Sequence, residues 1–102
     1  MEKVLAGTSV NVNAEGYFEN PAQWTKEMAN EMAKDYNLTL TDKHFAVFEF
    51  LRQRHMSGEQ LTIRRVGNSG IVDIKELYQL FPGGPLKISS KLAGIPKPTS
   101  CV

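Results

Sequence analysis

The sequence predicts a mainly α-helical domain that carries a small β-hairpin at its N-terminus and a flexible arm at its C-terminus. Apolar residues recur every three or four positions in several segments, which is typical of amphipathic helices. Near the N-terminus valines alternate with polar residues, and two closely spaced prolines lie near the C-terminus. A chain of 102 residues fits one compact orthogonal helical bundle, over residues 1–94, followed by the arm at residues 95–102. Helices are expected near residues 21–36, 42–57, 61–67, 74–81 and 85–93.

The first segment, about residues 4–18, is expected to form a hairpin that lies against the helices. Gly7-Thr8 supplies a turn between two short strands. A two-stranded hairpin alone is marginally stable, so one of its faces must be covered. Tyr17 and Phe18 follow and are expected to cover one end of the core.

The helix at residues 21–36 is predicted from its N-terminal signals. Asn20 is a favoured N-cap residue, and Pro21 suits the first helical position. Asn37 can adopt the left-handed conformation that ends a helix. The inward face of this helix is expected to be a stripe that recurs every four residues: Trp24, Met28, Met32 and Tyr36.

The helix at residues 42–57 is the most apolar and is expected to lie centrally. Thr41-Asp42 opens it and Gly58 ends it, because these residues suit the two ends of a helix. The stretch at residues 61–67 runs into the turn-forming sequence Gly67-Asn68-Ser69-Gly70, so it is expected to be a short helix or an extended segment.

The last two helices are separated by prolines and glycines. Asp73 and Glu76 form a capping pattern at the start of the helix at residues 74–81. Its apolar residues fall at helical spacing: Ile74, Leu77, Tyr78 and Phe81. Residues 82–85 then stop this helix and start the next, which is expected to end at a left-handed Gly94.

Composition limits the classes of function. A formal net charge of +1 predicts no overall attraction to nucleic acid or to a membrane. No apolar run approaches the roughly 20 residues that cross a bilayer, and the N-terminus lacks a secretory signal pattern, so a cytoplasmic location is expected. His44 and His55 have no partners at metal-ligand spacing, and no nucleophile–base set is recognisable. Neither a metal, another cofactor nor classical enzyme activity is therefore expected.

The only cysteine, Cys101, is the penultimate residue. Almost no chain follows it, so its side chain is free to enter a pocket on another protein. Pro96 and Pro98 favour an extended arm, and eight residues beyond Gly94 reach on the order of 25 Å. The thiolate is the reactive form; the terminal carboxylate disfavours it and Lys97 favours it, so activation in a partner's pocket is expected. The alternative is an inert cysteine in a tail.

Three motifs resemble, in the same order, the signatures of the DsrC/TusE family of sulfur-trafficking proteins. The motifs are Gly16-Tyr17-Phe18 with Asn20-Pro21 and Trp24, then Leu77-Tyr78-Gln79-Leu80-Phe81-Pro82 with Gly84-Pro85, and last AGIPKPTSCV, residues 93–102. The likeness covers nearly the whole chain. The DsrC branch has a second cysteine where this chain has Ser90, so the chain resembles the single-cysteine, TusE-like branch, although its PTSCV ending looks more like DsrC.

The resemblance implies that Cys101 carries sulfane sulfur between partners as a persulfide, without being a stand-alone enzyme. A TusE-like protein would link a sulfur-relay donor complex to a tRNA thiolation enzyme that makes 2-thiouridine. A DsrC-like protein would serve dissimilatory sulfite reductase, in sulfur oxidation or sulfite reduction. The expected state is a monomer, with a disulfide dimer on oxidation. The residues implied in the arm and in docking are Gly94, Pro96, Lys97, Pro98 and Arg64.

Two other features allow alternatives. The basic group of Arg52, Arg54, Arg64 and Arg65 could hold an anionic sulfur group or an acidic partner, or be a solvated face. The two short helices around Gly70 also fit a helix-turn-helix DNA-binding regulator. Asp73 and Glu76 disfavour contact between the second of these helices and phosphates, so direct nucleic acid binding is not expected.

Overall fold

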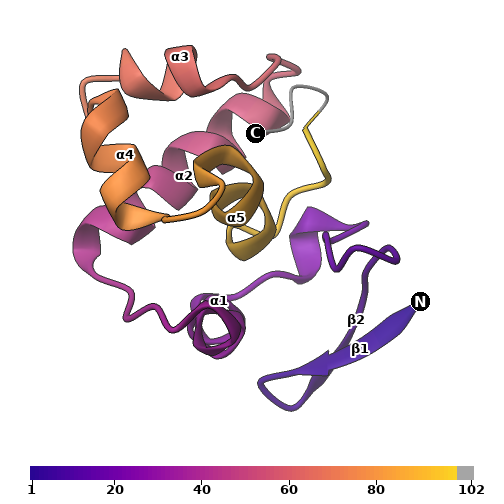
Figure 1. Ribbon diagram of the computed structural model, residues 1–102. Helices are drawn as coiled ribbons and strands as arrows, with labels where there is room; N and C mark the ends of the chain where they lie inside the picture. Colours follow the sequence, from indigo (N-terminus) through magenta and orange to yellow (C-terminus); the bar gives the residue numbers. More distant parts are fainter. Residues whose placement is uncertain (99–102) are drawn as a thin grey trace.

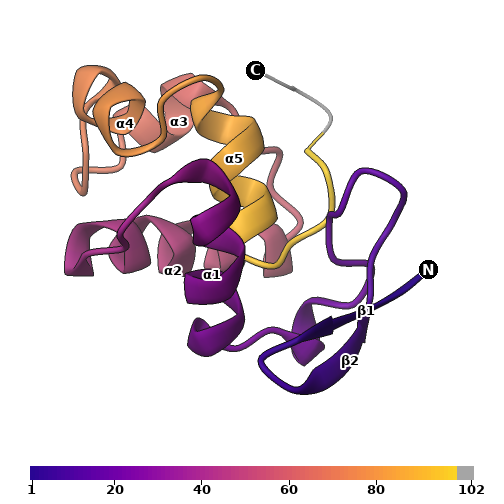
Figure 2. The same ribbon diagram turned by 60° about the horizontal axis from the view of Figure 1, so that its bottom comes forward.

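The computed structural model describes residues 1–98, which form a two-stranded antiparallel sheet and five α-helices. In chain order the elements are β1 (Glu2–Leu5), β2 (Thr8–Asn11), α1 (Lys26–Ala33), α2 (Asp42–Met56), α3 (Ile63–Gly67), α4 (Ile74–Leu80) and α5 (Pro85–Leu92). Figure 1 shows α5 in the middle of the molecule, with α2 behind it and the hairpin beyond α1. In Figure 2, α3 and α4 lie together on the side away from the hairpin. The predicted class, a mainly α-helical domain with an N-terminal hairpin, is confirmed.

The paired strands of the hairpin cover residues 2–11, whereas the predicted span is residues 4–18. Ala6 and Gly7 form its two-residue turn with φ of 49° and 78°, the positive values that a type I′ turn requires. The paired strands begin at residue 2 and end at residue 11. Beyond them, a single bridge between Val12 and Phe18 continues the pairing. The predicted hairpin is thus present, and its second half is mostly irregular.

The segment predicted as one helix over residues 21–36 is divided, which corrects the prediction. A 3₁₀ turn at Pro21–Gln23 ends at Trp24, whose ψ of 141° is extended. The α1 helix begins only after Thr25, whose hydroxyl accepts a hydrogen bond from the Met28 N–H at 3.3 Å. The extended backbone at Trp24 directs its indole toward the end of α5, a tertiary contact that no local signal indicates.

The α2 helix matches its prediction to within one residue and is tied to α4 by a histidine. The N–H of Thr41 donates to His44 Nδ1 at 3.1 Å. Because Nδ1 accepts, the His44 Nε2–H is the donor to the carbonyl of Leu80 at 3.0 Å. His44 therefore joins the start of α2 to the end of α4 through its two ring nitrogens.

The α3 and α4 helices approach closely where Gly67 meets Ile74. A Cβ at Gly67 would lie 2.4 Å from Ile74 Cγ1, so glycine is needed at the end of this short helix. The predicted apolar face of α4 is only half buried. Leu77 and Phe81 are fully buried, whereas Ile74 and Tyr78 are 44% and 47% exposed. No element of the described chain covers the outer half of this face.

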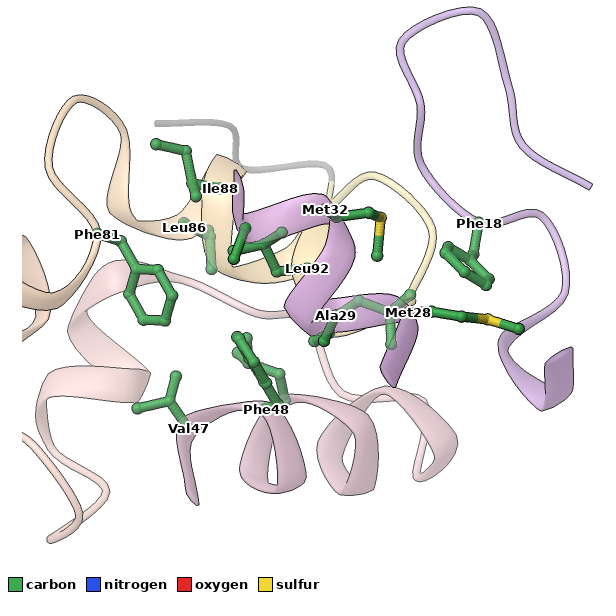
Figure 3. Close-up of a cluster of buried hydrophobic side chains, with 14 of the residues drawn as sticks. Phe18, Met28, Ala29, Met32, Val47, Phe48, Phe81, Leu86, Ile88 and Leu92 are labelled. Carbon is green, nitrogen blue, oxygen red and sulfur yellow. The ribbon is translucent and has the colours of Figure 1, made fainter. Parts of the chain in front are cut away.

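The core lies between α1, α2 and α5 and extends to the hairpin (Figure 3). Phe48 is at its centre, with its ring centroid 5.8 Å from that of Phe81 and 6.4 Å from that of Trp24. Figure 3 shows Met28 on the side nearest Phe18. The aromatic pair Tyr17 and Phe18 and the stripe that contains Trp24, Met28 and Met32 therefore pack in or against the core, as predicted. This packing helps to fix the position of α5.

Candidate functional site

The predicted arm leaves the fold at the C-terminal end of α5. Gly94 has a φ of +72°, the left-handed conformation expected of the residue that terminates this helix. The N–H of Ile95 then donates to the carbonyl of Ser90 at 3.3 Å. The side chain of Ile95 is fully buried. The packed core therefore includes Ile95, one residue beyond the predicted boundary at residue 94.

Trp24 lies directly against this helix end. Its indole N–H donates to the carbonyl of Leu92 at 2.8 Å. A Cβ at Gly94 would lie 2.2 Å from Trp24 Cδ1, a separation at which one of the two groups has to move. Glycine is therefore required at residue 94 for two reasons, the positive φ and the close approach of the ring.

Arg52 of α2 contacts both the Trp24 ring and the backbone at the end of α5. Its guanidinium donates to the carbonyls of Ala93 at 2.9 Å, Gly94 at 3.4 Å and Pro21 at 2.9 Å. Its Cζ also lies 4.4 Å from the centroid of the Trp24 ring, a cation–π contact. Burial lowers the pKa of the Arg52 guanidinium, but the group stays charged. It thereby satisfies carbonyls that the end of a helix leaves without partners. We refer to Trp24, Arg52, Gly94 and Ile95 as the arm anchor.

Beyond the arm anchor, residues 96–98 run along the surface. Lys97 Nζ donates to both carboxylate oxygens of Glu15, at 3.0 and 3.1 Å. This hydrogen bond lowers the pKa of the Glu15 carboxyl from its ordinary value, and the positive charge of Lys97 adds to the effect. On the other side, residues 96–98 line a groove of about 550 Å³ with His55 and residues 58–61. We call it the arm groove.

Cys101, the predicted sulfur-bearing residue, lies outside the described residues. It is the sixth residue after Ile95, and six extended residues span at most about 20 Å. Because packing continues through Ile95, this reach replaces the longer one expected for an arm that starts after Gly94.

The four arginines that are close in sequence belong to two different sites. Arg52 is part of the arm anchor. Arg54, Arg64 and Arg65 instead line a cleft of about 410 Å³ together with Glu59. This arginine cleft adjoins the arm groove, because residues 59–61 line both. Arg64, the arginine selected from the sequence, is therefore exposed beside the groove of the arm and does not contact the arm anchor.

Ser90 is fully buried in α5, and its hydroxyl has no hydrogen-bond partner among residues 1–98. Within the same residues there is no group of three histidine, cysteine, aspartate or glutamate side chains that could hold a metal ion. None of the helices in this part of the chain is both long and apolar enough to span a bilayer.

Residues 4–102 match the model of a protein family described as DsrC like protein. The chain belongs to the DsrC-like family. It is 32% identical over 107 residues to the sulfurtransferase TusE of Photorhabdus laumondii, a match that covers 97% of this chain and 96% of that protein. The NMR structure of Allochromatium vinosum DsrC is 34% identical with a TM-score of 0.83, and the match covers 100% of both chains. The oxidized gamma-subunit of the dissimilatory sulfite reductase (DsrC) from Archaeoglobus fulgidus has 27% identity and a TM-score of 0.82, also with complete coverage of both chains.

Membership of the DsrC-like family confirms the resemblance drawn from the three motifs. In this DsrC-like protein the arm anchor joins the first motif to the last, because Trp24 contacts Gly94. The sequence does not indicate this contact, since it places Trp24 on a helical stripe and Arg52 in a basic group. The predicted DNA-binding alternative finds no support among these relatives.

Proposed function

We propose that the chain is a sulfur carrier that accepts and donates sulfane sulfur at Cys101. The observation that carries the proposal is the attachment of the arm, which is packed through Ile95 and has the only cysteine six residues further on. Ile95 is held in the core, and the proline-containing segment beyond it spans at most about 20 Å. This length would let Cys101 enter a partner's pocket while the domain stays outside it. The relatives that are sulfurtransferases support this function.

The proposed uptake step is an exchange between sulfur atoms. The Cys101 thiolate attacks the outer sulfur of a donor persulfide, so that a new sulfur–sulfur bond forms on Cys101. The sulfur–sulfur bond of the donor breaks, and the donor leaves as a thiolate. No net oxidation or reduction occurs. Delivery is the same exchange with an acceptor thiolate, which returns Cys101 to its thiolate form.

The pathway that we favour is TusE-like. In it a sulfur-relay donor complex loads Cys101, and a tRNA thiolation enzyme uses the sulfur to make 2-thiouridine in the cytoplasm. The single cysteine supports this assignment, because a chain with Ser90 in place of a second thiol cannot protect its persulfide sulfur as an intrachain disulfide.

A second candidate is a DsrC-like role as a partner or substrate protein of dissimilatory sulfite reductase. The observation that favours it is the likeness of the whole fold to the gamma-subunit from Archaeoglobus fulgidus. The two candidates differ in the acceptor and share the chemistry of Cys101, so they make the same prediction for uptake.

The other residues have supporting roles in this proposal. Gly94 sets the direction in which the arm leaves, and Pro96 and Pro98 keep it extended. Lys97 ties the arm to Glu15 until a partner binds. Arg64 lies on the surface that a docked partner would cover, next to the arm groove.

Mass spectrometry of the intact chain tests the proposal. After incubation with glutathione persulfide, the wild type should gain about 32 Da for each added sulfur, and dithiothreitol should remove it. The Cys101→Ser variant should fold and gain nothing. A wild type that gains no sulfur from this donor or from a sulfur-relay donor complex is not a carrier.

A further inference from the structure

The arginine cleft has more positive charge than its own residues neutralise. Arg54 Nη1 lies 3.0 Å from one carboxylate oxygen of Glu59, and Arg65 Nη1 lies 3.9 Å from the other. Arg64 has no acceptor or ion-pair partner among residues 1–98. Three guanidinium groups therefore line a cleft with one carboxylate, which pairs with Arg54 and Arg65 and leaves the Arg64 guanidinium without an acceptor in the described chain.

The same cleft has an apolar floor. Phe50 and Leu61 line it, and Arg54 Cζ lies 5.1 Å from the centroid of the Phe50 ring. This cation–π contact positions the Arg54 guanidinium without using up its hydrogen-bond donors. A ligand that fits the cleft thus combines acceptor oxygens with some apolar surface.

We propose that the arginine cleft docks a carboxylate-rich segment of the protein that exchanges sulfur with the arm. The proposal rests on the proposed carrier function and names the surface that a partner would recognise. Residues 59–61 line both the cleft and the arm groove. A segment bound in the cleft therefore lies next to residues 96–98 and holds its protein where Cys101 can reach it.

The chemistry of the cleft favours an acidic peptide over a nucleic acid. Glu59 already shows that a carboxylate can bridge two of these arginines, and a second carboxylate would satisfy Arg64 in the same way. Nucleic acids are bound along extended basic tracks, because their charge repeats along the chain. Here the three arginines are gathered in one cleft, and the whole chain has a formal net charge of only +1.

A titration followed by NMR tests this inference on the full chain with Cys101→Ser, which removes the only thiol. The probes are a hexaglutamate peptide and hexauridylate RNA at low ionic strength. Hexaglutamate should shift the amide signals of Phe50, Leu61 and Ser69 in a saturable way. Arg64→Gln and Arg65→Gln should each weaken binding by about three- to tenfold, as expected for charged pairs that are partly exposed.

Two further variants distinguish docking from general electrostatic attraction. Glu59→Gln should tighten hexaglutamate binding, because it removes the carboxylate that competes for Arg54 and Arg65. Lys34→Gln removes an exposed charge at the end of α1, away from the cleft, and should leave binding unchanged. Absence of shifts in the cleft, tighter binding of the RNA, or equal effects of Arg64→Gln and Lys34→Gln would each overturn the inference. Because the probes bind without sulfur chemistry, such a failure differs from a failure of Cys101 to take up sulfur.

Discussion

Replacing Gly94 with alanine tests the arm anchor. Alanine at a φ of +72° costs about 1–2 kcal/mol relative to glycine. Its Cβ would also lie 2.2 Å from Trp24 Cδ1, and overpacking of this kind costs about 1–3 kcal/mol. The free energy of unfolding should therefore fall by about 2–5 kcal/mol. Urea unfolding followed by tryptophan fluorescence measures it, because Trp24 is the only tryptophan of the chain.

Gly58 provides the matched control for this experiment. Its φ of +76° is similar, and a Cβ there would meet no atom within 4 Å. Gly58→Ala should therefore show only the cost of the backbone conformation, about 1–2 kcal/mol. The difference between the two variants measures the contact with Trp24. Equal losses would refute the claim that this contact fixes the end of α5.

Two other predictions concern the residues around the arm. Arg52→Gln should lower the free energy of unfolding in urea by about 2–4 kcal/mol, since up to three carbonyls lose a charged donor. The control is Arg54→Gln, on the exposed face of the same helix, which should lower it by less than about 1 kcal/mol. Lys97→Gln should raise the pKa of Glu15 toward its ordinary value in an NMR titration, because Lys97 is the main cause of the lowering. In the wild type a lowered pKa means that the pair stabilises the folded state above the unfolded pKa of Glu15 and stops doing so as the pH falls through the folded pKa. An unchanged pKa of Glu15 in Lys97→Gln would show that the pair does not form in solution.

Features that depend on neighbours in the sequence were predictable. Asp73 caps α4 by accepting a hydrogen bond from the Glu76 N–H at 2.7 Å, as its capping pattern indicates. Asn37 and Gly94 both have the positive φ expected at helix ends. The motifs also predicted the family, since they are short segments whose residues can be read directly.

Features that depend on tertiary contacts were not predictable. The break at Trp24 exists because the indole binds the end of α5, which lies at the other end of the chain. Tyr78 and Ile74 have helical spacing, but no described element covers them. Arg52 has the same side chain as Arg54, and only the position of each around α2 decides that one joins the arm anchor and the other the arginine cleft.

The carrier function itself is tested most directly by following a sulfur label through a reconstituted relay. A labelled donor complex, this chain and a tRNA thiolation enzyme would be mixed with tRNA, and the label would be measured in 2-thiouridine. The wild type should pass the label to tRNA, and the Cys101→Ser variant, with the arm anchor intact, should pass none. Transfer of the label at the same rate with Cys101→Ser would contradict the account.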